Sequence, residues 1–189
     1  RIRDELDLLP PGDLRMALAA LCGDDTWGRT WAEVLQHRFG GAGELAGHSL
    51  GNLLIAAVWQ RLGDPVRGLD LVGELLDAHG RVLPMSTVPL TLRSVVLDEA
   101  TAQTREVLGQ VEVATTPGRV VDLSLLPGDP PACPQAVRAV LDADLVVLGP
   151  GSWFSSVLPH LLVPELAEAI ASTSACRLVV LNLAAATSE

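Results

Sequence analysis

The final third of the chain alternates between expected helices and short apolar strands, and this order constrains the fold more than any other feature. We predict helices over residues 134–143 and 164–171, and strands over residues 145–148 and 178–181. Strands that alternate with helices in this way form a parallel sheet with helices packed on its faces. The sequence therefore predicts an α/β fold.

The first eighty residues carry a helical pattern, because apolar residues recur there at a spacing of three to four. A helix is expected to begin after Pro10 and Pro11, with Asp13 as its N-cap. Further helices are expected over residues 48–62, ending at Gly63, and over residues 65–78.

The middle of the chain favours short strands, which we expect over residues 82–83, 90–97, 110–115 and 120–126. The last two are separated by Thr116, Pro117 and Gly118, which predicts a hairpin. No linker or repeat divides the sequence, so residues 1–189 are expected to form a single domain.

Every basic residue of the chain is an arginine. The 13 arginines face 23 acidic residues, which gives a formal net charge of -10. An acidic protein repels phosphate backbones and anionic bilayers, so we expect no nucleic-acid partner and no membrane insertion, although a local arginine cluster could bind one small phosphate. Without lysine, a P-loop NTPase site is also excluded.

The cysteine and histidine residues give no metal-binding pattern. The three cysteines have no Cys-x-x-Cys spacing, and the four histidines form no i, i+4 pair. An odd number of cysteines in apolar surroundings favours a reducing, cytoplasmic setting. We therefore predict neither a metal site nor a required cofactor.

Residues 47–51, Gly-His-Ser-Leu-Gly, match the G-x-S-x-G pattern of serine hydrolases letter for letter. A hydrolase using Ser49 is a distant alternative, because the nucleophile must follow a buried strand and residues 40–46 are not one. The second interpretation is a helix N-terminus, where His48, Ser49 and Asn52 supply donors to an anion such as a diphosphate. The third is that His48 and Asn52 only cap the helix.

A second glycine segment follows the apolar strand at residues 145–148. Gly149 and Gly151 form a turn that is followed by hydroxyls at Ser152, Ser155 and Ser156. Ligands of open α/β sheets bind beyond the carboxyl ends of the strands, where such turns expose N–H groups. Many structural turns use glycine only for its backbone freedom, so a purely structural turn is the alternative interpretation of this segment.

Five motifs occur in an order and spacing that resemble one known family. They are Leu9-Pro-Pro-Gly-Asp-Leu-Arg15, His37-Arg-Phe39, Gly47-His-Ser-Leu-Gly-Asn-Leu53, Ala143-Asp-Leu-Val-Val-Leu-Gly-Pro-Gly-Ser152 and Leu158-Pro159. Together they resemble the YvcK/CofD-like family, and specifically its YvcK branch, the gluconeogenesis factors.

The resemblance implies a Rossmann-like three-layer domain with a mostly parallel sheet that binds a nucleotide. For the YvcK branch it implies a cytoplasmic protein that binds a UDP-sugar such as UDP-N-acetylglucosamine and supports cell shape, wall synthesis and growth on gluconeogenic carbon. We favour a regulatory protein over an enzyme, because no nucleophile, base and orienting group occur together in the sequence. Self-association and partners in wall synthesis fit this role. The alternative is the CofD branch, which transfers a phospholactyl group to a deazaflavin.

The resemblance also assigns candidate ligand-binding residues and expected gaps. The glycine-rich phosphate loop and the C-terminal part of the family are expected to lie outside this chain. No catalytic residue is predicted. The ligand-binding candidates are Gly12, Asp13, Arg15, Arg38, His48, Asn52, Gly149, Gly151, Ser152, Ser155 and Asn182.

Overall fold

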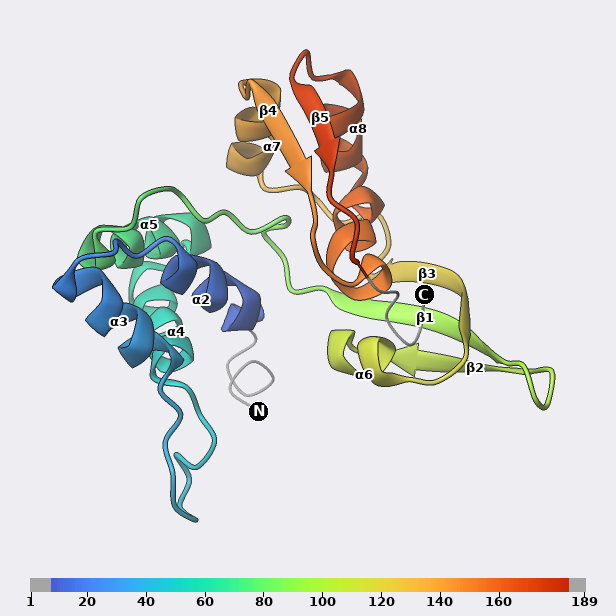
Figure 1. Ribbon diagram of the computed structural model, residues 1–189, viewed down its shortest axis with the longest axis horizontal. Coiled ribbons are helices and arrows are strands. Elements are labelled where there is room, and N and C mark those ends of the chain that lie inside the picture. The colour runs from blue at the N-terminus through green and yellow to red at the C-terminus, as the bar shows by residue number, and fades with distance from the viewer. Residues whose placement is uncertain (1–7, 184–189) are drawn as a thin grey trace. The chain divides into compact units, whose positions relative to one another are not determined.

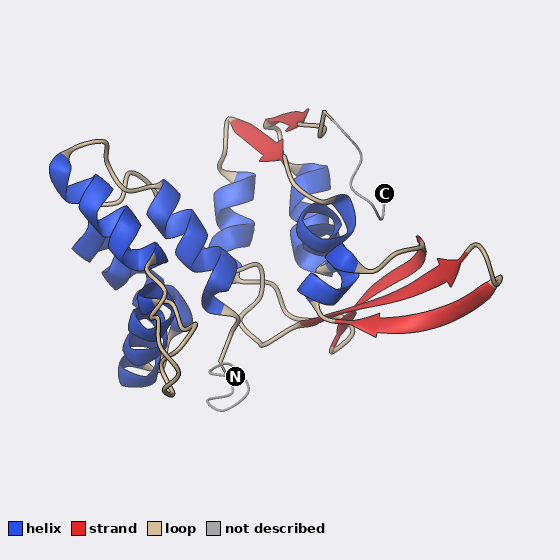
Figure 2. Cartoon of the chain, turned by 60° about the horizontal axis from the view of Figure 1, so that its bottom comes forward, coloured by secondary structure: helices blue, strands red, loops and turns tan. Residues whose placement is uncertain are grey.

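The computed structural model describes residues 8–183 and divides into two compact units, residues 1–84 and residues 85–189 (Figure 1). The α/β class is confirmed, since helices and strands both occur and alternate in the second unit (Figure 2). That the two units form one domain stays a prediction. Among the described residues, no helix is both long and apolar enough to cross a bilayer.

The first unit contains the helices α2 (Pro11–Ala20), α3 (Thr26–Gln36), α4 (Leu50–Leu62) and α5 (Pro65–Leu76). Local sequence signals fix several of their ends. The Asp25 side chain accepts a hydrogen bond from Gly28 N at 2.7 Å, and Gly63 ends α4 with φ of 66°. The Asp64 carboxylate accepts from the backbone N–H groups of Val66 and Arg67 and so caps α5.

The predicted N-cap of α2 is wrong. Pro10 occupies the cap without a side-chain hydrogen bond, and Asp13 lies inside the first turn. Pro11 already has the backbone angle that a first helical residue requires, so the helix begins three residues earlier than an N-cap at Asp13 would place it. Asp13 can still interact favourably with the helix dipole.

The core of the first unit consists of apolar side chains contributed by all four helices. Its most deeply buried members are Leu18, Leu35, Ile55, Leu69, Val72 and Leu76. Trp59 packs among them, and its indole N–H donates to Pro65 O at 2.9 Å. The helical periodicity of the sequence therefore marks the buried faces correctly.

The second unit begins with an antiparallel sheet of β1 (Thr91–Asp98), β2 (Gln103–Leu108) and β3 (Arg119–Leu126), in the order β2-β1-β3. The pairing of β1 with β3 contains a bulge: Val95 pairs with Asp122, but Val96 pairs with Val120. Val121 is the extra residue of β3. A single extra residue of this kind bends the strand and increases its twist.

The predictions for the middle of the chain are partly wrong. Residues 110–115 form helix α6 (Gln110–Thr115), residues 82–83 form no strand, and the hairpin joins β1 to β2. Helix α6 follows Gly109, which has φ of 104°, and it buries Val113 completely. The segment is a helix although its valines alternate, because burial of Val113 in the core outweighs the local preference for a strand.

The last part of the second unit contains α7 (Pro134–Leu141), β4 (Leu145–Leu148), α8 (Pro164–Ser172) and β5 (Cys176–Val179). β4 and β5 pair in parallel, with α8 in the connection between them. The predicted helix and strand alternation is confirmed, with β5 two residues earlier than expected. The described sheets are nevertheless small and partly antiparallel.

Candidate functional site

Arg15 joins three helices of the first unit. Its side chain leaves α2, its Nε donates to Asn52 Oδ1 of α4 at 3.0 Å, and its Nη1 donates to Gln36 Oε1 of α3. Only 4% of the residue is exposed. Burial lowers the pKa of Arg15, the nearby Arg38 charge lowers it further, and Asp13 acts in the opposite direction. The two amide acceptors are neutral, so neither cancels the arginine charge.

Gly51 provides the space for the Arg15 side chain. A Cβ at this position would lie 2.7 Å from Arg15 Cγ, 2.8 Å from Arg15 Cδ and 2.8 Å from Leu35 O. No other residue type fits without displacing one of these groups. The second glycine of the Gly47–Gly51 motif is therefore required by the packing of an arginine against α4.

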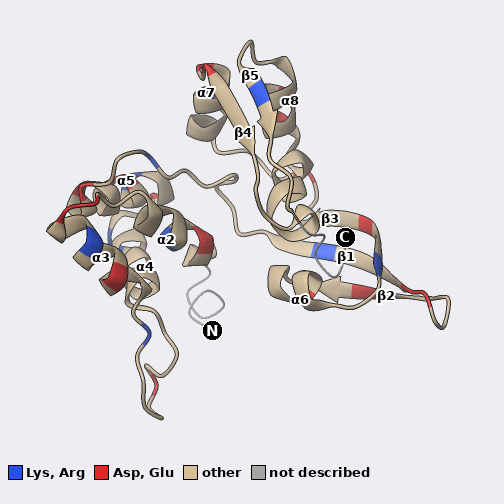
Figure 3. Cartoon of the chain, viewed as in Figure 1, with Lys and Arg blue, Asp and Glu red and all other residues tan. Residues whose placement is uncertain are grey.

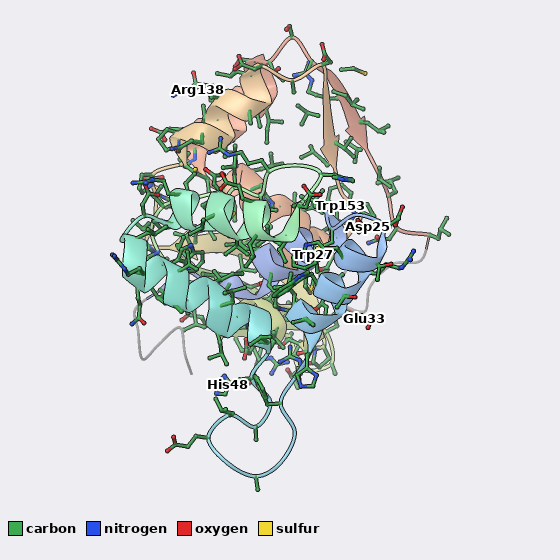
Figure 4. All side chains as sticks on the ribbon, turned by 90° about the vertical axis from the view of Figure 1, so that its left-hand side faces the viewer. Asp25, Trp27, Glu33, His48, Arg138 and Trp153 are labelled. Carbon is green, nitrogen blue, oxygen red and sulfur yellow. The ribbon has the colours of Figure 1, made fainter. Side chains whose placement is uncertain are left out.

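A narrow loop of residues 37–49 leads from α3 to α4 and extends away from the helices (Figure 1). Its base is closed by an antiparallel bridge between Arg38 and Ser49, and Phe39 N donates to His48 O at 3.0 Å. Arg38 Nη1 donates to Gly47 O at 2.8 Å. His48 lies at the base of this loop (Figure 4).

Ser49 is the N-cap of α4. The residue is 1% exposed, and its buried hydroxyl has no hydrogen-bond partner. A buried hydroxyl without a partner costs free energy, which a ligand oxygen could recover. The positive end of the α4 dipole lies at the same place. We call the group formed by Arg15, Arg38, His48, Ser49 and Asn52 the Arg15–Arg38 site.

The Arg15–Arg38 site has the composition of an anion site. One arginine packs on the first turn of α4 through Gly51, and the other pairs its backbone with Ser49 just before that turn. The helix start is therefore flanked by two cations. The capping interpretation of Asn52 is wrong, because its side-chain oxygen accepts from Arg15 and Ser49 is the cap.

The glycine turn of the second unit is held by Asn182. Gly151 N donates to Asn182 Oδ1 at 3.3 Å, and Asn182 Nδ2 donates to Gly151 O at 2.9 Å. Gly149 has φ of 87°, and a Cβ there would lie 2.6 Å from Val180 O. Ser152 follows with a buried hydroxyl that has no partner. Asn182 thus positions the turn, and the Ser152 hydroxyl beside it is a hydrogen-bond donor without an acceptor.

The structure groups the predicted ligand residues within each unit. In the first unit Arg15, Arg38, His48 and Asn52 gather at the start of α4, while Gly12 and the exposed Asp13 lie in the first turn of α2. In the second unit Asn182 contacts Gly151, and Ser155 is buried with its carbonyl accepting from Gln110 Nε2 at 3.1 Å. That both groups line one pocket stays a prediction.

Gln36 is a site residue that the sequence analysis missed. It is the last residue of α3, and its partner Arg15 lies 21 residues earlier on another helix. No spacing rule connects two such positions. Only the tertiary packing of α2 against α3 reveals the contact.

Two cavities of the first unit lie apart from these residues. One of about 140 Å³ is lined by Asp25, Trp27 and His79 among others, with the first two at the start of α3 (Figure 4). The other, of about 380 Å³, is lined by α5 and residues 78–82, with Leu18 of α2. Neither includes a predicted ligand residue.

Two kinds of catalytic arrangement, a metal cluster and an activated Ser49, are relevant to the described part of the chain. No group of three histidine, cysteine or acidic side chains within residues 8–183 is arranged to hold a metal ion. The Ser49 hydroxyl is buried and has no base within hydrogen-bond distance. Acidic and basic residues are spread over both units (Figure 3).

The whole chain, residues 1–189, matches the family model described as 2-phospho-L-lactate transferase CofD. A "Putative gluconeogenesis factor" of Mycobacterium tuberculosis is 57% identical over 191 residues, which cover all of this chain and 56% of the relative. The gluconeogenesis factor of Bacillus subtilis is 34% identical, with 97% of this chain and 55% of the relative covered.

The fold is also similar to that of a solved protein. A crystal structure of a member of the UPF0052 family from Bacillus halodurans superposes with a TM-score of 0.84 at 36% identity. The match covers 96% of this chain and 56% of that one. The chain spans little more than half the length of these relatives.

Proposed function

Because the chain belongs to the CofD family and is similar over its whole length to gluconeogenesis factors, we propose that it is a regulatory protein that binds a nucleotide sugar. The ligand in this proposal is of the UDP-N-acetylglucosamine type. The protein acts in the cytoplasm, without a required cofactor, and supports cell shape, wall synthesis and growth on gluconeogenic carbon sources. Self-association and protein partners in wall synthesis belong to the same proposal.

The Arg15–Arg38 site is the observation that supports this proposal best. A diphosphate carries about two negative charges to a protein whose net charge is -10, so long-range attraction is unfavourable. Affinity must therefore come from short-range contacts. The exposed Arg38 and the start of α4 offer such contacts, and the charge of Arg15 and the unpartnered hydroxyl of Ser49 lie buried beside them.

The turn at Gly149 supports the same ligand class independently. It follows the carboxyl end of β4, and the parallel partner β5 leads directly to Asn182. Strand ends of parallel sheets are the usual location of nucleotide sites. In this proposal the hydroxyl of Ser152 donates to the ligand while Asn182 keeps the turn in shape.

The family description favours a second candidate, a transferase that moves a phospholactyl group to a deazaflavin. The two candidates differ in what the protein does after binding. Turnover of a guanylylated phospholactate with magnesium and deazaflavin would support the transferase. Saturable binding of UDP-N-acetylglucosamine without turnover would support the regulatory protein.

Titration calorimetry of the full-length protein with UDP-N-acetylglucosamine tests the proposal directly. Arg38→Gln should weaken binding about tenfold to a hundredfold, because a charge-assisted hydrogen bond contributes roughly 1.5–3 kcal/mol. Arg61→Gln is the matched control, since it removes the same charge from the last turn of α4. If both variants bind like the parent, the Arg15–Arg38 site is not the ligand site.

A further inference from the structure

The residue that holds the Arg15 guanidinium from the side of α3 is an amide. Gln36 is exposed and ends α3, and its Oε1 accepts from Arg15 Nη1. Asn52 Oδ1 holds the Nε of the same group at 3.0 Å. Buried arginines are usually matched by a carboxylate, because a buried charge without one is costly. Here both holding groups fix the direction of the guanidinium without neutralising it, and the Asp13 carboxylate acts on its charge from the first turn of α2.

The positive charges around Arg15 make the neutrality of the Gln36 side chain important. Arg38 is near enough for its charge to act on Arg15, and both flank the N-terminal end of α4. Two cations and a helix dipole repel one another where no anion is bound. A glutamate in place of Gln36 could make the same hydrogen bond and would neutralise Arg15. The amide therefore preserves a positive field that a carboxylate would remove.

We infer that Gln36 is a positioning residue that fixes the Arg15 guanidinium and, by being neutral, reserves its charge for a phosphate-bearing ligand. The inference rests on the proposed function, since it assigns the ligand phosphates to the Arg15–Arg38 site. Arg15 is only 4% exposed, so it acts on the ligand mainly through its field. The exposed Arg38 is available for direct contact.

The test compares Gln36→Glu with Gln60→Glu in the full-length protein. Gln60 is exposed near the end of α4, about 12 Å along the helix from Asn52 at 1.5 Å per residue, so its variant adds the same charge away from the site. Three ligands are titrated: UDP-N-acetylglucosamine, inorganic pyrophosphate and uridine. Thermal unfolding is measured in parallel.

We expect Gln36→Glu to lower the affinity for the two phosphate ligands at least tenfold, with uridine binding and the unfolding temperature not reduced. Gln60→Glu should change each affinity less than twofold. Equal affinities of the two variants for pyrophosphate would overturn the inference. So would a parallel loss for all three ligands, because that outcome indicates a structural role only.

Failure of the proposed function gives a different result. A parent protein that binds pyrophosphate but not UDP-N-acetylglucosamine would refute the nucleotide-sugar proposal, and pyrophosphate would still decide the role of Gln36. A parent protein that binds neither phosphate ligand refutes both statements.

Discussion

Replacing Gly51 by alanine should both destabilise the first unit and weaken ligand binding. The new Cβ would lie 2.7–2.8 Å from Arg15 Cγ, Arg15 Cδ and Leu35 O. Ordinary carbon–carbon contacts lie at about 3.5 Å or more, so one neighbour must move by about 0.7 Å. Leu35 O is a backbone atom of α3 and moves little, so the Arg15 stem has to shift.

The shift has two consequences of known size. Overpacking in a core costs about 1–3 kcal/mol, which corresponds to a fall in Tm of roughly 2–12 °C for a chain of this length. Moving the arginine by the same distance takes its Nε beyond hydrogen-bond range of Asn52 Oδ1, from the present 3.0 Å. Arg15 then no longer holds its place beside the site, and the affinity for UDP-N-acetylglucosamine should fall about tenfold or more.

Gly73→Ala is the matched control for this substitution. Gly73 lies within α5, and a Cβ there would make ordinary contacts of 3.9 Å with Leu18 and 4.0 Å with Ala78. Alanine is the better helix former, so this variant should gain up to about 1 kcal/mol. Urea unfolding of both variants gives the comparison. The reasoning is refuted if Gly51→Ala is as stable as Gly73→Ala and binds the ligand like the parent.

Two further substitutions test the hydrogen bonds described above. Asn182→Ala removes both hydrogen bonds to Gly151, so the free energy of unfolding in urea should fall by about 1–3 kcal/mol and nucleotide-sugar binding should weaken. Unchanged affinity would show that the turn has no part in the site. Asp70→Asn tests the pair with Arg81, whose hydrogen bonds hold the pKa of Asp70 below its usual value. Because the pKa of Asp70 is lower in the folded protein than the unfolded-state pKa of about 4, the ionised carboxylate stabilises the folded protein at pH values above about 4. This stabilisation is lost as the pH falls through the lower, folded-state pKa. The free energy of unfolding of the variant should therefore be lower by about 0.2–1 kcal/mol at pH 7, a small amount because Arg81 is half exposed. In strong acid the variant and the parent should be equally stable. An equal difference at both pH values would contradict this account.

The helices were more predictable than the sheet for a physical reason. Each helix of the first unit buries one stripe of apolar residues and begins or ends at a proline, aspartate or glycine that the sequence displays. Strand β2 was missed because nearly all of its residues are exposed, so no alternation marks it. Helix α6 was mistaken for a strand because its two valines alternate, although only Val113 is buried.

The site was predictable where a motif is local and not where it depends on packing. The turn at Gly149 and the start of α4 both follow from glycines and polar residues that are neighbours in sequence. The contacts of Arg15 with Gln36 and Asn52 span 21 and 37 residues. Such contacts form only when the three helices pack together, and no pattern in the sequence predicts them.

The bulge in β3 makes one position of the sheet tolerant of a change in chain length. Because Val96 already pairs with Val120, removing Val121 would leave Asp122 and Val120 opposite Val95 and Val96 in an unbroken ladder. Every side chain would keep its face, and only an exposed valine would be lost. A deletion elsewhere in β3 would instead turn the residues on one side of it over, moving apolar groups into water. Descendants of this sequence that differ by one residue in this sheet should therefore carry the difference at Val121.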